Sequence, residues 1–319
     1  MSPPTAPATD RDSRPPPPVS ARATSVLSGS RALSVIALLP FLAFLVVFAL
    51  YPLAELVRLS VTDTTIVGGA FVSAWAGPAN FVTAWTDVAA GRSALITIAF
   101  VILCVGVTIV LGLTLALLVD RAVVLAGAAR NVLIWPAVVA PVVVSTMWLL
   151  LLSPTVGGIN KVLASVGLPT QGWLDSEFGA FVSIVVVDVW HWTPVVFLFM
   201  FTALRGIDRE VLEAARIDGA GEWQIVGRVV LPIIRPAIVA VALVRLVMSI
   251  KAFDEMYLLT RGGPGGATNL ISLHIRSLFF DQLAFGPAAA LSISIVAVTC
   301  AVVGGALVAR RLRREGGPA

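Results

Sequence analysis

Six long apolar segments dominate this chain of 319 residues. A helix that rises 1.5 Å per residue needs about 20 residues to cross a hydrocarbon core about 30 Å thick, and every one of the six is long enough. They are residues 32–54, 94–119, 132–152, 181–204, 237–259 and 287–309. Hydrophobic residues make up 58% of the chain and charged residues 13%, so the charges are too few to cover a soluble domain. The sequence therefore predicts an integral membrane protein.

The expected fold class is all-α, with six transmembrane helices. Hydrocarbon offers no hydrogen bonds, so each crossing segment must satisfy its own backbone groups, as a helix does. A transmembrane β-barrel would need shorter segments of alternating hydrophobicity. Pro136 and Pro141 fall in the third segment and Pro194 in the fourth, and we expect kinks at these positions.

Arginine and lysine are distributed unevenly around the six segments. The N-terminal tail, the 120–131 turn, the 205–236 loop and the C-terminal end carry fifteen of them, and the other three loops carry five. Because positively charged flanks stay in the cytoplasm, both termini are expected on the cytoplasmic side. The cluster that follows the last segment supports this orientation; it consists of Arg310, Arg311, Arg313 and Arg314.

The chain is expected to divide into four regions. Residues 1–30 form a disordered, proline-rich cytoplasmic tail. Residues 31–93 hold the first helix and an external loop, residues 94–309 form the core with its loop at 205–236, and residues 310–319 form a basic cytoplasmic end. A cleaved signal peptide is the alternative for the N-terminus, but its apolar stretch would be only about 7–15 residues long, so we expect the first segment to remain as an anchor.

Several classes of function are excluded by residues that the sequence lacks. It holds two cysteines and two histidines, too few for a disulfide framework or an imidazole-based metal site. The net charge of +4 reflects membrane-flanking arginines, so no nucleic-acid partner is expected. No G-x-x-x-x-G-K-[ST] phosphate loop occurs, so ATP hydrolysis by this chain in the usual way is not expected. Energy for any transport must come from another polypeptide or from a gradient.

The 205–236 loop differs from the rest of the chain in its dense, mixed charges. Asp208 is suited to cap a short helix, and Gly219 to end it in the left-handed conformation. A second short helix is expected to stop at Pro232. The first helix has an apolar face, made by Val211, Leu212, Ala214 and Ala215, and nothing in this chain is expected to bury it. We therefore expect a partner protein to cover it; an amphipathic hairpin on the lipid surface is the alternative.

The spacing in this loop resembles a known signature, EAA, three residues, G, nine residues, then I-x-L-P. The matching residues are Glu213, Ala214, Ala215, Gly219, Leu231 and Pro232, with Val229 in the place of isoleucine. Further likeness lies in NFVTAWTD, VWHWTP, FDEMYLLTRGGPGGAT and FGPAAALS. The chain resembles the membrane-spanning subunits of bacterial binding-protein-dependent ABC importers, on the sugar-importing side that is similar to maltose and glycerol-phosphate permeases.

This resemblance implies a type I importer permease fold of the MetI-like kind in the bacterial inner membrane. It also implies that the loop is a coupling helix seated on a cytoplasmic ATPase. The implied partners are a second homologous permease subunit in a heterodimer, a dimer of ATP-binding subunits and an extracytoplasmic solute-binding protein, besides membrane lipid. No cofactor is implied in this chain, because ATP and Mg would be used by the partner ATPase.

Polar residues within the apolar segments indicate a candidate substrate path. Asp188 lies in the fourth segment, where an acid at membrane depth marks a functional site and faces the bundle interior. At spacings of three and four, Asp188, His191 and Trp192 share one helix face, with Trp190 beside them. Carboxylates bind hydroxyls and indole rings stack on sugar rings, so a sugar or polyol suits this face. For the two tryptophans, an aromatic belt at the membrane interface is the alternative.

The fifth segment contributes further candidates to this path. Arg245 is costly in lipid and must find a carboxylate, a carbonyl or a watery cavity, with Asp188 as one possible partner. Asp254 and Tyr257 are expected near the outer end of the same segment, before a glycine-rich turn at Gly262–Gly266. A solute-binding protein would find room to dock at that turn; a solvated external loop is the alternative.

Three rival functions remain open from the sequence. A gradient-driven transporter would use Asp188 and His191 as a proton relay. A permease of the same class would carry an amino acid, a peptide or an anion instead of a sugar. A channel would pass its substrate without any nucleotide.

Overall fold

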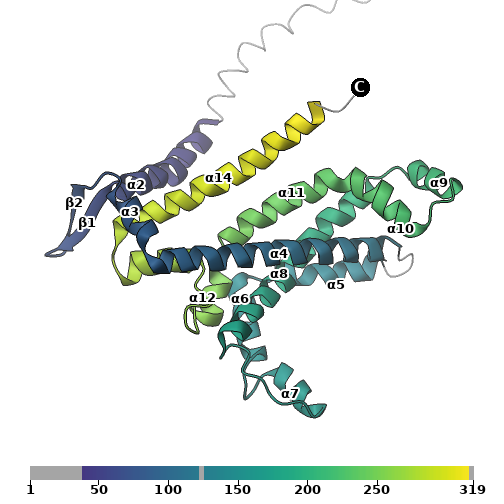
Figure 1. Ribbon diagram of the computed structural model, residues 1–319, viewed down its shortest axis with the longest axis horizontal. Coiled ribbons are helices and arrows are strands. Elements are labelled where there is room, and N and C mark those ends of the chain that lie inside the picture. Colours follow the sequence, from purple (N-terminus) through teal and green to yellow (C-terminus); the bar gives the residue numbers. More distant parts are fainter. Residues whose placement is uncertain (1–37, 122–125, 316–319) are drawn as a thin grey trace, which may run out of the picture. The chain divides into compact units, whose positions relative to one another are not determined.

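The computed structural model describes residues 38–121 and 126–315 (Figure 1). The chain divides into two units, Met1–Glu55 and Leu56–Ala319. The predicted disordered tail, residues 1–30, lies outside the described residues, as do 316–319 of the basic end. The first unit contributes most of a helix, Leu38–Ser60, which is long and apolar enough to cross a membrane. It contains a π-helical turn, η1 (Val46–Leu50), and continues as α2 (Tyr51–Ser60), so it ends six residues later than the apolar segment suggested.

The second unit is a helical bundle with one small β-hairpin (Figure 1). Four of its helices are long: α4 (Val88–Arg121), α8 (Glu177–Arg205), α11 (Leu231–Ile250) and α14 (Phe285–Glu315). The shorter ones are α3 (Ala79–Thr86), α5 (Ala126–Val138), α6 (Pro141–Leu151), α7 (Gly158–Ser165), α9 (Arg209–Ile217), α10 (Glu222–Ile225), α12 (Asp254–Thr260) and α13 (Ile271–Arg276). The described residues hold five helices long and apolar enough to cross a membrane, or six if one bent pair counts as a single span. The predicted all-α membrane fold is confirmed.

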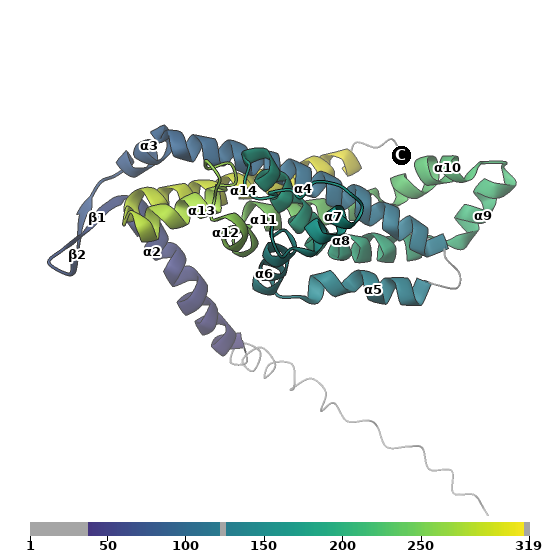
Figure 2. The ribbon, with the colours of Figure 1, turned by 90° about the horizontal axis from the view of Figure 1, so that it is seen from below.

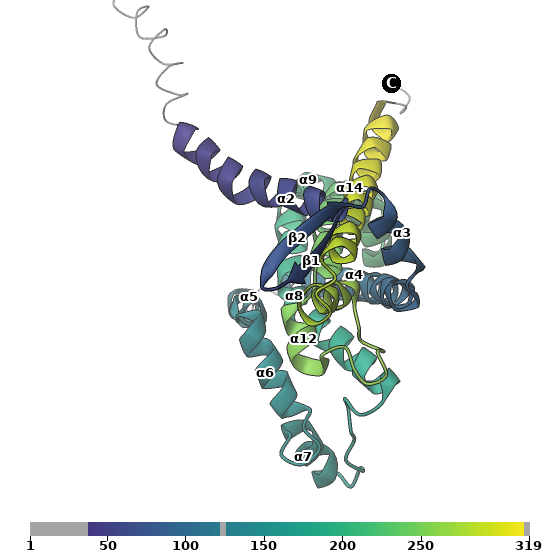
Figure 3. The same cartoon turned by 90° about the vertical axis from the view of Figure 1, so that its left-hand side faces the viewer.

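The third predicted segment, 132–152, is broken in the middle. Its two halves, Asn131–Val138 and Pro141–Leu151, meet at 101°, and Figure 3 shows α6 turning away from α5. Pro141 opens α6, where its missing N–H costs nothing, and the preceding residue, Ala140, is extended. The expected kink is therefore a full break. Pro194 lies inside α8 without ending it.

The fifth predicted segment, 237–259, has the wrong bounds. The helix begins at Glu222 and runs to Ile250, so Pro232 does not stop it. A π-helical turn, η2 (Val226–Val230), precedes the proline, and there the N–H of Leu231 donates to Val226 O. The wider π turn leaves room for the proline ring at the start of α11. At the other end the helix stops at Lys251, and the chain restarts as α12.

A β-hairpin and a short helix follow α2, and the sequence did not predict them. Strands β1 (Thr62–Val67) and β2 (Ala70–Trp75) pair antiparallel, with Val67 opposite Ala70. The two-residue turn between them, Gly68–Gly69, has positive φ at both positions, as the tight turn of a hairpin requires. Asn80 on α3 fixes this region, because its side-chain amide donates to Ser60 O at 3.1 Å and to Thr62 O at 2.9 Å.

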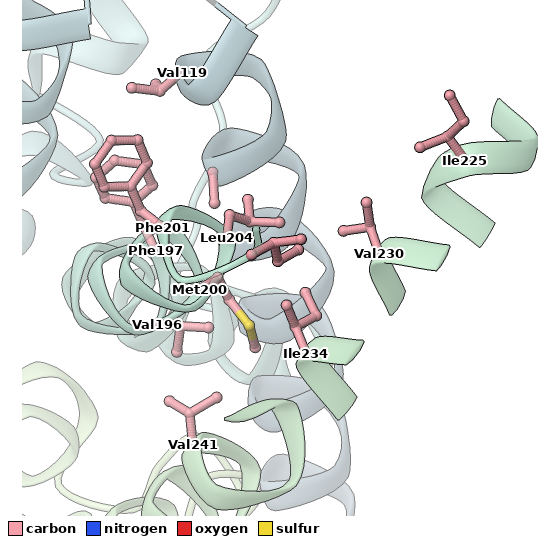
Figure 4. Packing of buried hydrophobic residues seen from close by; sticks show 12 residues of the cluster. Val119, Val196, Phe197, Met200, Phe201, Leu204, Ile225, Val230, Ile234 and Val241 are labelled. Atoms are coloured by element: carbon pink, nitrogen blue, oxygen red, sulfur yellow. The ribbon is translucent and has the colours of Figure 1, made fainter. Parts of the chain in front are cut away.

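The core of the second unit lies where α4, α8 and α11 pack together. Figure 4 shows Val196 and Met200 of α8 near Ile234 and Val241 of α11. The backbones of α4 and α8 approach closely at Gly112. A Cβ atom there would lie 2.7 Å from Val196 Cγ1 and 3.0 Å from the backbone nitrogen of Phe197. Close approach at small residues is how helices associate in lipid, where packing replaces the hydrophobic effect.

The two ends of the second unit differ in what they carry. Figure 2 shows α9 and α10 at one end, and the β-hairpin and α3 at the other. Ion pairs tie the first end together, since Arg205 Nε lies 3.0 Å from Asp120 Oδ1 and Arg121 Nη2 lies 3.1 Å from Glu222 Oε2. The 205–236 loop therefore lies at the C-terminal ends of α4 and α8.

The close contact at Gly112 predicts a specific cost of enlarging this residue. Gly112→Val must push α4 away from α8, and overpacking of this kind costs about 1–3 kcal/mol. We expect a lower midpoint of thermal unfolding for the detergent-solubilised protein. Gly106→Val is the matched control, because a Cβ at Gly106 meets nothing within 4 Å. Equal midpoints for the two variants would contradict the close packing described here.

Candidate functional site

The 205–236 loop forms a helical hairpin, as its sequence predicts. Asp208 occupies the N-cap position of α9, although its side chain makes no capping bond. Gly219 has φ +81° and reverses the chain between α9 and α10. Arg216 Nε lies 3.3 Å from Glu222 Oε1, which joins the two arms. Glu213 and Ala214 are exposed on α9.

The apolar residues of the hairpin fall into two groups. Leu212 and Ala215 pack against the core cluster that α4, α8 and α11 share. The expectation that this chain has nothing to bury the hairpin is therefore wrong for these two residues. Ile217 and Trp223, by contrast, are 86% and 85% exposed. Large apolar side chains this exposed make a surface suited to a protein partner.

The last two signature residues do not lie in the hairpin itself. Leu231 and Pro232 are in the first turn of α11. Leu231 is half-buried and packs on the same core cluster as Leu212, whereas Pro232 is exposed. The signature therefore spans the hairpin and the start of the helix that leaves it.

A buried polar cluster joins α4, α8 and α11 in the middle of the bundle. Asp188 Oδ2 is paired with Arg245 Nη2, and each side chain is only 1% exposed. Arg245 Nε also lies 3.5 Å from Thr108 Oγ1. Its guanidinium carbon lies 5.5 Å from the centre of the Trp192 ring. Of the partners considered for Arg245, the structure shows the carboxylate of Asp188, and this pair occupies side chains that had been assigned to a substrate.

His191 makes a second buried pair, which the sequence did not reveal. Its Nδ1 contacts Glu255 Oε1 on α12, and its Nε2 lies 3.2 Å from the carbonyl oxygen of Val139. A carbonyl only accepts, so Nε2 donates to Val139. His191 thereby links α8 to α12 and to the break between α5 and α6. The sequence did not predict this pair, because residue 255 was expected within one uninterrupted fifth helix, whereas it lies on the separate helix α12.

The remaining candidates for the substrate path separate into three places. Trp192 and Asp254 line a cavity of about 270 Å³. The other residues lining this cavity are Pro141, Met248, Lys251, Ala252, Phe253 and Glu255. Trp190 instead packs edge-on against Trp148, with ring centres 5.6 Å apart, and lines an apolar groove of about 940 Å³. Tyr257 lies on α12 beside Arg276, away from the expected fifth span.

The cavity of about 270 Å³ has the chemistry of a polyol site. The indole of Trp192 offers a flat apolar face, and Lys251 and Asp254 supply one cation and one carboxyl group. The carboxyl group of Glu255, which also lines the cavity, is paired with His191. Asp188, His191 and Arg245 do not line this cavity. They instead form buried pairs that join α8 to α11 and to α12. Of the seven predicted path residues, only Trp192 and Asp254 meet at this cavity.

The sequence of this chain is similar to a protein family and to individual transport proteins. Residues 108–314 match the family described as the binding-protein-dependent transport system inner membrane component. The trehalose/maltose transport system permease protein MalF of Thermococcus litoralis is 29% identical over 80% of this chain and 86% of its own length. The lactose transport system permease protein LacF of Rhizobium radiobacter is 30% identical over 81% of this chain and 87% of its own length.

A solved structure shares the fold. The crystal structure of a bacterial ABC transporter involved in the import of the acidic polysaccharide alginate aligns with a TM-score of 0.78 at 22% sequence identity. The alignment covers 93% of this chain and all of the other. A second crystal structure contains the alginate transporter with its periplasmic protein bound to an alginate pentasaccharide.

Because Asp188 and Arg245 form a buried ion pair, we expect their substitutions to have non-additive effects on the free energy of unfolding. Arg245→Met leaves Asp188 buried without its cation, and breaking such a pair costs about 3–5 kcal/mol. In the double variant Asp188→Leu, Arg245→Met no charge remains, so most of that loss is recovered. The stabilities of the single and the double variant are compared by thermal unfolding of the detergent-solubilised protein. Arg92→Met, in the exposed Arg92–Glu177 pair at 3.8 Å, is the control and costs at most about 1 kcal/mol. A double variant as unstable as the single one would contradict the charge argument.

Proposed function

The chain belongs to the family of binding-protein-dependent transport system inner membrane components, and on that premise we propose that it is the permease subunit of an ATP-driven importer for a sugar or related polyol. Its partners are a second homologous permease in a heterodimer, a dimer of ATP-binding subunits, an extracytoplasmic binding protein and membrane lipid. The protein resides in the bacterial inner membrane with both termini in the cytoplasm. The chain itself is not an enzyme, and ATP and Mg are used by the partner ATPase.

The exposed surface of the α9–α10 hairpin is the observation that carries this proposal. Ile217 and Trp223 are large, apolar and exposed, and Glu213 is exposed on the same face of α9 as Ile217, four residues before it. The hairpin also contacts the bundle through Leu212, Ala215 and the pair Arg121–Glu222. A partner that binds this surface can therefore move the helices that contact the hairpin. Such a contact is what an ATPase needs in order to drive a separate membrane subunit.

The helix Glu222–Ile250 connects that contact to the cavity. Its 29 residues make it about 40 Å long. Its first four residues are α10 of the hairpin, and Met248 and Lys251 line the cavity at its other end. Between them, Arg245 holds the helix against α8 through Asp188. Movement of the hairpin thus reaches the cavity walls along one continuous element, which supports alternating access driven from the hairpin.

Two observations support a sugar as the substrate. Both relatives named above are described as permeases for disaccharides, and a further one is described as transporting starch degradation products. Trp192 and Asp254 together suit the apolar face and the hydroxyl groups of a sugar ring. The structure gives no support to a relay that passes protons directly between Asp188 and His191, because each is paired with a different residue.

A variant of the exposed hairpin surface tests the contact with the ATPase. Trp223→Ser removes a large apolar side chain that is 85% exposed, so the protein still inserts and folds. We expect loss of co-purification with the ATP-binding subunit and loss of sugar uptake. Trp75→Ser on β2 is the matched control, since Trp75 is 79% exposed at the opposite end of the bundle. Normal association of the ATPase with Trp223→Ser would contradict the proposed docking surface.

A variant of the cavity tests the substrate site independently. Trp192→Leu removes the stacking surface, and we expect KM for the transported sugar to rise about 10-fold, which corresponds to about 1.4 kcal/mol. Association with the ATPase is expected to remain intact. Trp190→Leu, on the other side of α8, serves as the control and leaves KM unchanged. If both variants raise KM equally, the cavity is not the sugar site.

A further inference from the structure

A polar pocket of about 370 Å³ lies between the loop that follows α12 and the helix α13. Tyr257, Arg261, Asn269, Arg276 and Asp281 are among the residues that line it. Asn269 Nδ2 donates to Ser93 Oγ at 3.2 Å, so the pocket lies by the N-terminal end of α4. The α9–α10 hairpin lies at the other end of that helix. On the proposed function, this pocket therefore opens on the extracytoplasmic side.

The wall of this pocket is a fixed loop. Thr268 is fully buried, and its hydroxyl contacts Gly263 O at 2.8 Å and Thr260 Oγ1 at 2.7 Å. The backbone N–H of Ile271 donates to Thr97 Oγ1 on α4 at 2.8 Å. The loop is thus held both to itself and to the bundle, so its side chains are presented in a set arrangement.

The charges of the pocket do not balance. Arg276 donates to both carboxylate oxygens of Asp281, at 2.8 and 3.1 Å, and its guanidinium lies 4.6 Å from the Tyr257 ring centre. Arg261 makes no ion pair within the described part of the chain. It therefore leaves one positive charge uncompensated at the pocket.

The backbone at Arg261 adds a second argument. Arg261 ends α12 with φ +50°, a left-handed conformation that glycine adopts without cost and other residues disfavour. Four glycines stand close by, at positions 262, 263, 265 and 266. An arginine at this position of the turn costs conformational energy, which is offset if its guanidinium makes a contact in the assembled transporter.

We propose that this pocket accepts a carboxylate side chain of the extracytoplasmic binding protein, with Arg261 as its partner; this rests on the proposed function. A guanidinium matches a carboxylate through two parallel hydrogen bonds, which gives both attraction and orientation. A substrate carboxylate is the less suitable occupant. Tyr257, which lines the pocket, stacks on Phe253, which lines the sugar cavity, with ring centres 5.5 Å apart, so an aromatic pair stands between the two spaces.

The test uses the whole transporter in lipid nanodiscs. ATP hydrolysis is measured while the sugar-loaded binding protein is titrated. Arg261→Glu raises the half-saturating concentration of binding protein about 10-fold without changing the maximal rate, since a charge at the rim of an interface acts on association. Arg261→Gln has a smaller effect. Added salt weakens the wild type more than Arg261→Glu. Lys161→Glu, which reverses another exposed cation in an extracytoplasmic segment, leaves the half-saturating concentration unchanged.

The outcomes separate this proposal from the one on which it rests. An unchanged half-saturating concentration in Arg261→Glu overturns the proposal while leaving the importer function intact. Loss of uptake of acidic sugars alone, again with unchanged half-saturation, assigns the pocket to a substrate carboxylate and also overturns it. If no binding protein stimulates ATP hydrolysis by the wild type, the importer function itself fails.

Discussion

The absence of hydrogen-bonding solvent in hydrocarbon governs this structure. Backbone groups at membrane depth must be satisfied by the protein, so a helix can break there only where another residue takes up the freed groups. Both breaks in the bundle meet this condition. At the α5–α6 break, Val139 O accepts from His191 Nε2, and after α11, Ala252 O accepts from Ser272 Oγ at 2.5 Å. The two interruptions are therefore built features of the bundle.

These two breaks also locate the candidate site. Pro141, which restarts the chain after the first break, and Lys251, Ala252 and Phe253, which form the second, all line the cavity of about 270 Å³. Irregular backbone at membrane depth is tolerated where it lines a cavity, and broken helices form the substrate sites of many transporters. The buried pairs of α8 hold the broken elements in place around this cavity. The same buried pairs of α8 thus stabilise the bundle and position the walls of the candidate site.

The sequence was most informative where local chemistry decides the outcome. Uninterrupted apolar runs predicted α4, α8 and α14, and Gly219 predicted the reversal of the hairpin. Asp188 was one of the partners expected for Arg245, because a cation at membrane depth needs a carboxylate, a carbonyl or a watery cavity. Prediction failed where distant partners decide: the π turn before Pro232 and the break at Lys251 depend on packing that no local pattern encodes. The path residues were misassigned for the same reason, since His191 meets Glu255 only after α12 folds back.

We propose that an ATPase binds the hairpin at the start of the helix Glu222–Ile250 and moves the cavity walls through it. To test this contact, a photoreactive amino acid is incorporated at Ile217 and the native membrane is irradiated. A covalent adduct with a nucleotide-hydrolysing subunit is expected. Adducts with lipid alone at Ile217, together with an ATPase adduct from a probe at Trp75 at the opposite end, would contradict it.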